Sequence, residues 1–409
     1  MTDVIVAFSA IAAIMILSFI GEVVSRRVIL PSVILLIILG IICGPALHLF
    51  EYDALVAFVP FIAPLTIAFI GFEAGMKMDI YEVMEQSKRA FLLSILGFVF
   101  GTVTVGFFLH YFLGVEWSYA FLMASAWGGV STATVDTVCK HLRLSEKTRT
   151  TLIMTSLADD SIVLISTLTI LNYILLGEIG IRESILILAS NICTSIFIGV
   201  LAGLAWINLV YLTRKAEYTY TFILAAILFV YSITEILGGT GGIAIFIFGL
   251  MLGNFRSVTS ALKLRMNKKE LSTVVVQIEN FHSQLTFIIR SFFFTFIGLI
   301  YVFTGIVELL LGLAVSIILH LTRFLAVKIG TFRSPLASDL PAIGFIVGKG
   351  VASAAMSTLP LAYNLPNASF LASTALNVIL FINVISIVLP FLLSKRVPRT
   401  TTPTDFRGR

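Results

Sequence analysis

The chain has 409 residues, of which 58% are apolar and only 12% are charged, and its mean hydropathy is +1.05. A soluble globular protein carries roughly 25% charged residues, so this composition excludes a soluble protein. The formal charge of +5 is compatible with nucleic-acid binding, but the basic residues form short clusters between apolar runs long enough to cross a bilayer. We therefore expect a membrane protein with no nucleic-acid partner.

Apolar runs of about 20 residues predict an all-α, polytopic membrane protein with about 13 transmembrane helices. The first run follows neither a basic segment nor a cleavage site, so we expect it to be retained as a helix. One long apolar run is divided at Thr304-Gly305, and residues 256–283, which are mixed polar and apolar, are predicted to form a helix on the cytoplasmic surface. The predicted spans cover residues 4–24, 28–47, 54–74, 90–112, 117–139, 150–176, 184–212, 218–237, 241–255, 285–303, 305–331, 338–362 and 368–394.

The positions of the basic residues predict the orientation, because cytoplasmic loops carry an excess of Lys and Arg. If the N-terminus is outside, Arg182 is the one basic residue in an outer loop, whereas Arg290, Arg323 and Lys349 lie inside spans. All the others of the 27 Lys and Arg then face the cytoplasm. We predict a multi-pass protein of the cell membrane, embedded in its lipid, with the N-terminus outside and a short basic cytoplasmic tail at 395–409.

Two groups of three spans have the arrangement of an inverted repeat. The fourth to sixth spans and the eleventh to thirteenth are seven positions apart, an odd offset, so the second group must run in the opposite direction. The middle span of each group is interrupted, by residues 127–134 in one and by Gly348-Lys349-Gly350 in the other. Paired interrupted helices indicate a binding site near the membrane midplane. The alternative is that Gly and Ser only allow close helix packing.

Asp159 and Asp160 are the strongest candidates for a functional site. They lie about ten residues, or ~15 Å, into the sixth span, which is too deep for an Asp side chain to reach the interface. Ionisable residues inside a membrane are costly and are functional by default. Neighbouring residues of a helix point about 100° apart, so the two carboxylates serve different faces. Ser156, one turn from Asp160, could add a hydroxyl oxygen to a cation site.

Other charges inside the spans supply partners for these carboxylates. A buried unpaired charge is much costlier than a paired one, so we expect the pairs Asp159–Arg323 and Glu73–Lys349. These pairings leave Asp160 to hold either a proton or a monovalent cation. Competition for one carboxylate is sufficient for cation–proton exchange. Asn383, in the last span, is expected to make a hydrogen bond between helices.

The residues at these four places resemble those of the monovalent cation:proton antiporters, the sodium/proton exchangers of the NapA and NhaP types. The motifs are Phe72-Glu73-Ala74-Gly75, the break with Ser131 and Thr132, Ala158-Asp159-Asp160, and Gly348-Lys349-Gly350. The resemblance implies that Asp160 carries Na⁺, that Ser156, Ser131, Thr132, Asp159 and Glu73 are candidate ion ligands, and that Arg323 and Lys349 compensate charge. It also implies a homodimer. An enzyme activity and a cofactor are not expected.

The resemblance further implies one transmembrane domain, 1–394, with a moving core at about 54–176 and 305–394. The dimer or scaffold helices are then expected at about 4–47 and 184–303. Asp159 stands where electroneutral members usually have Asn, and Thr155 where they have an acidic residue, so the sixth span is similar to the two-aspartate branch. Ser131-Thr132 lies near the position where many members carry Thr-Asp, and this chain has no Asp there.

Several functions are compatible with these residues. Exchange of Na⁺ or Li⁺ for protons is favoured, and K⁺/H⁺ antiport or sodium-coupled carboxylate symport on the same core are alternatives, since Arg323 and Lys349 could hold an anion. An intramembrane aspartyl protease is disfavoured because the carboxylates are adjacent on one helix, and no repeated segment predicts a channel filter. One proton moves per cation if the Asp159–Arg323 pair stays closed, and two if it opens; we favour the second.

Overall fold

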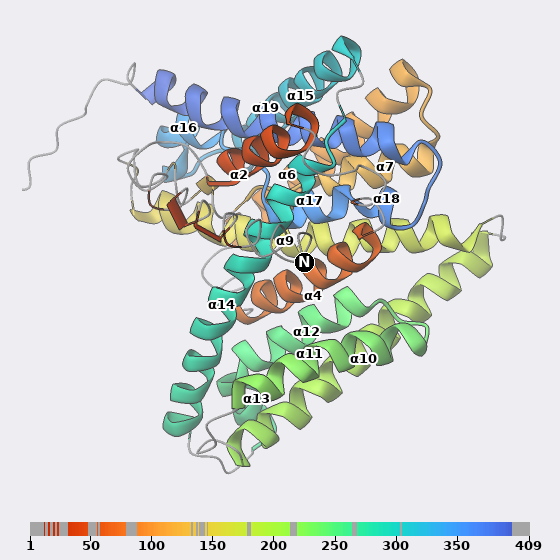
Figure 1. Ribbon diagram of the computed structural model, residues 1–409. Helices are drawn as coiled ribbons and strands as arrows, with labels where there is room; N and C mark the ends of the chain where they lie inside the picture. Colours follow the sequence, from red (N-terminus) through yellow and green to blue (C-terminus); the bar gives the residue numbers. More distant parts are fainter. Residues whose placement is uncertain are drawn as a thin grey trace, which may run out of the picture.

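The computed structural model describes residues 32–47, 58–78, 88–131, 146–177, 181–212, 219–263, 268–302 and 305–394, with a few isolated positions elsewhere. The predicted first span at 4–24, apart from isolated positions, and the tail at 395–409 lie outside this part. All regular elements of the described residues are helical (Figure 1), which confirms the predicted all-α class.

Each predicted span from the second to the thirteenth has helical counterparts within the described residues. Breaks occur where the sequence predicts them, in the fifth and twelfth spans. The elements are α2 (Ser32–Ile41), η1 (Ile42–Ala46), α4 (Val59–Lys77), α6 (Lys88–Leu113), α7 (Trp117–Ala126), α9 (Glu146–Leu176), α10 (Ile181–Leu212), α11 (Thr219–Ile236), α12 (Gly241–Gly253), α13 (Phe255–Ala261), α14 (Lys268–Leu299), α15 (Ile306–Gly330), η2 (Pro335–Asp339), α16 (Leu340–Ile343), α17 (Val351–Ser357), α18 (Leu359–Ala362) and α19 (Ala368–Ser394).

Length and composition identify the helices that can cross a bilayer. Among the described residues six helices qualify, and α12 together with α13, bent by 78°, would be a seventh. Shorter apolar helices lie at 33–46, 220–236 and 351–362, where further spans are predicted. The chain is thus a multi-pass membrane protein in which several spans are short or broken.

The predicted cytoplasmic surface helix at 256–283 is wrong for most of its length. The short helix α13 ends at Ala261, and α14 then runs from Lys268 to Leu299 without a break. Val274, Val275 and Ile278 recur on one face of α14 and are buried in a cluster with residues of α4, α11 and α12. The amphipathic pattern therefore reflects packing against protein, with the same helix continuing into the tenth span.

The predicted division of the long apolar run is confirmed. Helix α14 ends at Leu299, α15 begins at Ile306, and Gly305 between them has φ +149°, a conformation that residues with a side chain rarely adopt. A single helix across this point is excluded by the backbone itself.

Helix α12 lies at the centre of one group of helices, in contact with α4, α10 and α11 (Figure 1). Its glycines bring it against the α4 backbone: a Cβ atom on Gly249 would lie 2.3 Å from the Phe72 carbonyl oxygen, and one on Gly253 would lie 2.2 Å from that of Met76. Small residues allow such close approach of helices in membranes. Helices α4 and α12 consequently pack backbone to backbone.

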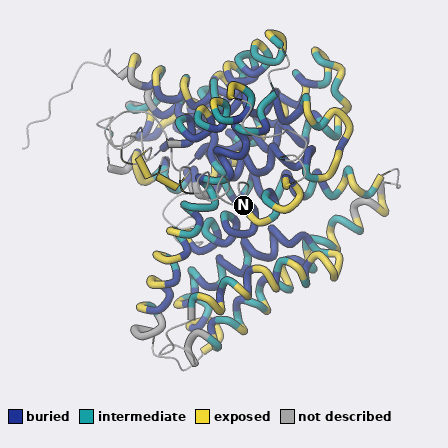
Figure 2. Tube along the Cα trace, viewed as in Figure 1, coloured by how far each residue is buried: buried dark blue, intermediate teal, exposed yellow. Residues whose placement is uncertain are grey.

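The second group consists of α6, α7, α9 and α15 to α19, which contact one another extensively. Burial is densest here, whereas exposed positions line the outer sides of helices such as α10 (Figure 2). Both broken spans, α7 with the segment that follows it and α17 with the segment before it, belong to this group. Its interior therefore contains non-helical backbone.

Candidate ion site at the crossing of two broken helices

The two breaks meet in the middle of the second group. Helix α7 ends at Ala126 and is followed by non-helical residues through Ser131, while residues 346–350 are likewise non-helical before α17 starts at Val351. The Ser131 N–H donates to the Gly348 carbonyl at 2.8 Å, which joins the two segments. Non-helical backbone at this depth needs such partners because lipid offers none.

Glycine is required where the segments cross. A Cβ atom on Gly348 would lie 2.3 Å from Thr134 Oγ1, and one on Gly350 would lie 2.4 Å from Ser131 Oγ. Side chains at these two positions would force the segments apart. The Gly-Lys-Gly motif thus permits the crossing and places Lys349 at its centre.

Asp159 of α9 is fully buried beside the crossing and forms the predicted ion pair. Its Oδ2 accepts the Val130 N–H at 3.1 Å and lies 3.8 Å from Nη1 of Arg323. The other carboxylate oxygen, Oδ1, and Arg323 Nε have no hydrogen-bond partner among the described residues. The Asp159–Arg323 pair is therefore confirmed, as a single long contact in which each partner keeps an unused polar atom.

Arg323 is anchored independently of Asp159. Its Nη1 donates to the Leu93 carbonyl of α6 at 3.2 Å, and its side chain passes directly over Gly97, where a Cβ atom would lie 2.3 Å from Nη1. The guanidinium is held by α6, whereas the carboxylate is held by the break after α7. The two charges can therefore separate while each retains an anchor.

Lys349 is buried, and its Nζ donates to the Gly129 carbonyl in the other break. The charges of Asp159, Arg323 and Asp160 all act on it. The predicted pair with Glu73 is wrong, because Lys349 bonds to backbone across the crossing. Among the described residues, two basic and two acidic side chains consequently share this region.

Glu73 instead contacts one residue of α4 and one of α14. Its Oε1 accepts from Lys77 Nζ at 2.5 Å, one turn along the same helix, and from Ser283 Oγ of α14 at 3.1 Å. A neighbour at i+4 is the nearest available cation for a helical Glu. A role for Glu73 as an ion ligand stays a prediction.

The remaining predicted ligands lie close to Asp159 in the chain or in the break. Asp160 is half-buried on α9, so it is more accessible than Asp159. Ser156 is buried and its hydroxyl donates to the Ile153 carbonyl at 2.8 Å, which leaves its oxygen lone pairs for a ligand. Ser131 is buried at the crossing, and Thr132 lies outside the described residues. Their role in ion binding stays a prediction.

Hydrogen bonds from α19 fix the Lys349 segment, and sequence reasoning found only one of the residues that make them. Asn383 donates to the Lys349 carbonyl at 3.0 Å and accepts from Thr134 at 3.2 Å. Ser386 accepts the Val347 N–H at 3.1 Å and contacts His320 Nε2 at 3.1 Å. Asn383 and Ser386 are three residues apart on one helix face, a polar spacing that could have marked Ser386 as well.

We expect Asp159→Asn to weaken exchange without abolishing it and to move its pH profile. The amide can still accept the Val130 N–H, but it carries no charge for Arg323 and cannot exchange a proton. Exchange in proteoliposomes across a pH series measures both effects. A profile identical to that of the wild type would contradict the involvement of Asp159 in proton movement.

Two broken helices that cross beside buried carboxylates are the architecture of a secondary transporter with an inverted repeat. The model of one family, described as the transmembrane domain of the sodium/hydrogen exchangers, matches residues 11–395. The chain belongs to this family.

Solved structures agree with the fold. The sodium proton antiporter MjNhaP1 from Methanocaldococcus jannaschii, at pH 8, superposes with a TM-score of 0.76 over 96% of this chain and 99% of that one, at 19% sequence identity. This similarity in fold covers nearly the whole chain.

Curated relatives match over part of their length. The K(+)/H(+) antiporter NhaP2 of Shewanella sp. (strain MR-4) is 26% identical over 239 residues, covering 56% of this chain and 41% of the relative. The low-affinity Na(+)/H(+) antiporter NhaS1 of Synechocystis sp. is 29% identical over 231 residues, covering 56% and 42%. The chain thus matches less than half the length of these two proteins.

Proposed function

We propose that the chain exchanges Na⁺ or Li⁺ for protons across the cell membrane, with cation and proton competing for Asp160. The observation that carries this proposal is the half-buried Asp160 next to the fully buried Asp159–Arg323 pair, at the crossing of two broken helices. Hydroxyl and backbone oxygens near a carboxylate suit a hard monovalent cation. The buried hydroxyl of Ser156, one turn from Asp160 on the same helix, is proposed to supply one such oxygen.

Two protons are proposed to move per cation. The Asp159–Arg323 contact of 3.8 Å is longer than the 2.7–2.9 Å typical of charge-assisted hydrogen bonds. Each partner has a second anchor, at Val130 and Leu93. Both features favour opening of the pair, which would let Asp159 take and release a second proton.

The test is exchange in proteoliposomes with the membrane potential clamped and varied, offering Na⁺, Li⁺, K⁺ and a carboxylate in turn. A two-for-one cycle moves net charge, and each charge is worth about 2.3 kcal/mol per 100 mV, so the rate should depend on voltage. Asp159→Asn should remove that dependence. A wild type indifferent to voltage would refute the two-proton cycle, and uptake of the carboxylate without cation–proton exchange would refute antiport.

Apparent cation affinity should improve as the pH rises and then level off. Protons occupy Asp160 at low pH and must leave before the cation binds, so raising the pH removes the competitor until the carboxyl is fully ionised. Cation-concentration curves measured between about pH 6 and pH 9 give the affinities. A constant affinity across this range would argue against a shared carboxylate.

K⁺/H⁺ antiport is a second candidate. It is favoured by the relatives named K(+)/H(+) antiporters, which include one from Shewanella baltica aligned over 87% of this chain at 24% identity. The same site would serve either ion, since a carboxylate with oxygen ligands does not by itself select Na⁺ over K⁺. The K⁺ arm of the exchange assay decides between them.

The cell-membrane location, the orientation with the N-terminus outside, and the homodimer are likewise proposals. For the moving core, the close packing of α4 on α12 favours placing α4 with the static helices. The proposed moving unit then consists of residues 88–176 and 305–394, and the dimer is proposed to form through the other group. Cysteine cross-linking across the two groups tests this division.

A further inference from the structure

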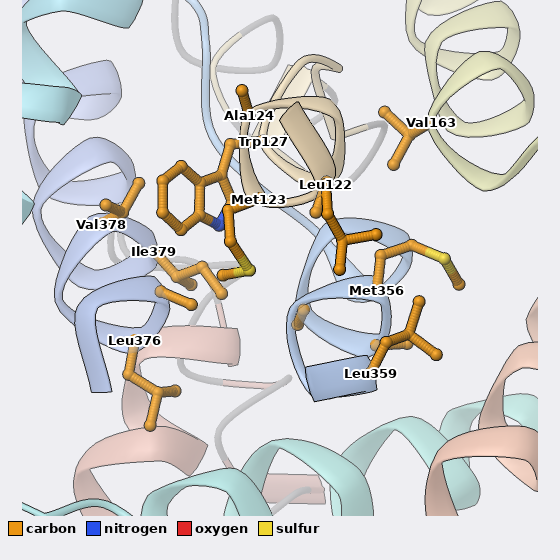
Figure 3. Close-up of a cluster of buried hydrophobic side chains, with 14 of the residues drawn as sticks. Leu122, Met123, Ala124, Trp127, Val163, Met356, Leu359, Leu376, Val378 and Ile379 are labelled. Carbon is orange, nitrogen blue, oxygen red and sulfur yellow. The ribbon is translucent and has the colours of Figure 1, made fainter. Parts of the chain in front are cut away.

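Trp127, one of three tryptophans in the chain, directly follows the last residue of α7 and is completely buried. Its ring lies among Met123, Val378 and Ile379, with α17 close by (Figure 3). The packing explains the buried ring, but it leaves the indole N–H to be satisfied. A buried Trp N–H normally finds a hydrogen-bond acceptor.

The acceptor belongs to the other broken span. Trp127 Nε1 donates to Ser357 Oγ of α17 at 3.0 Å, and the Ser357 hydroxyl donates onward to the Ser353 carbonyl at 2.7 Å. This bond joins the helical part of one broken span to that of the other. It is separate from the backbone bond between Ser131 and Gly348.

The backbone after Trp127 has little freedom on its other sides. A Cβ atom on Gly128 would lie 2.5 Å from the Phe98 ring of α6, and one on Gly129 would lie 2.7 Å from Val163 of α9. The segment therefore threads between α6 and α9. These contacts restrict sideways movement of the segment. Its position along the chain direction therefore depends on how its two ends are held.

Those ends are Trp127 and Ser131, and the peptide groups between them contact the charged residues. The Gly129 carbonyl accepts from Lys349, and the Val130 N–H donates to Asp159. A displacement of the segment would move an acceptor away from Lys349 and a donor away from Asp159 together. The Trp127–Ser357 bond is thus placed to set both contacts.

We propose that Trp127 and Ser357 are positioning residues that fix the segment 128–131, and through it the charge environment of Asp159 and Lys349. The effect on transport rests on the proposed exchange function. The bond acts on the ion site indirectly, through the backbone between its ends. Neither side chain is a ligand of the ion.

Trp127→Phe keeps an aromatic ring and loses the N–H, whereas Ser357→Ala removes the acceptor. We expect each to lower exchange about threefold to tenfold, as for loss of one hydrogen bond, and to shift the pH of half-maximal exchange in the same direction. The double variant should be no worse than the single ones, and Ser357→Thr should restore the wild-type profile. Trp206→Phe, on α10 outside the crossing, is the matched control.

The proposal would be overturned if the losses of exchange in Trp127→Phe and Ser357→Ala added up in the double variant. It would also be overturned if the variants only reduced the amount of folded protein and left the pH profile of the folded molecules unchanged. A second measurement does not depend on transport. With Trp117 and Trp206 replaced by Phe, the resonance Raman band of the remaining indole reports its N–H hydrogen bond. Ser357→Ala should shift this band to the unbonded position, and an unshifted band would contradict the bond even if the wild-type protein exchanged no ions.

Discussion

Asp160→Asn should abolish both cation-driven proton movement and cation binding. Asn is nearly the same size but neither ionises nor supplies a negative charge, so it removes the competition between proton and cation while disturbing the packing little. Asp159 cannot replace it, because it is fully buried and held by the Val130 N–H near Arg323. Exchange and binding of ²²Na⁺ by purified protein measure the two losses.

Glu116→Gln is the matched control, since it also neutralises an acid of the second group of helices but at an exposed position before α7. It should exchange at the wild-type rate. If Asp160→Asn vesicles retained full exchange, the ion would have to be carried by another residue and the proposed mechanism would fail.

Arg323→Met should have the largest effect on stability. It would leave the Asp159 carboxylate buried without its ion-pair partner, and removing one partner of a buried pair typically costs about 3–5 kcal/mol. The Lys349 charge, which also acts on Asp159, places our expectation toward the lower end. Thermal unfolding in detergent measures the loss, and Lys328→Met, exposed on the same helix, should change little.

The double variant Asp159→Asn with Arg323→Met separates charge from packing. Both charges are then gone, and replacing a buried pair by neutral side chains is often neutral. We expect the double variant to recover most of the stability lost by Arg323→Met alone. A double variant as unstable as the single one would mean that Arg323 acts mainly through its packing and its bond to Leu93.

The sequence was most informative where a charged residue lies within an apolar span. Asp159, Arg323 and Lys349 are charges in apolar spans, so their depth could be predicted and the Asp159–Arg323 pair could be inferred. The partner of Lys349 could not be predicted, and the expected pair with Glu73 was wrong, because Lys349 bonds to a backbone carbonyl. Any residue supplies such a carbonyl, so it leaves no mark in the sequence.

The surface helix at 256–283 was mistaken for a related reason. An amphipathic helix has the same pattern whether its apolar face meets lipid headgroups or other helices, and α14 buries that face in a cluster with residues of α4, α11 and α12. The Trp127–Ser357 bond was likewise hidden, because a Trp and a Ser that are 230 residues apart become neighbours only once the two broken spans cross.

Helix α14 also has a mechanical consequence. Its 32 residues extend about 48 Å, whereas the hydrocarbon core of a bilayer is about 30 Å thick. Near its C-terminal end it is clamped to α2, where a Cβ atom on Gly298 would lie 2.3 Å from the Ile37 carbonyl oxygen. Toward its other end, Val274, Val275 and Ile278 pack in the cluster around α12. Helix α14 thus links α2 to that cluster, and a spin label at exposed Val276, paired with one on α2, would report any movement between the two.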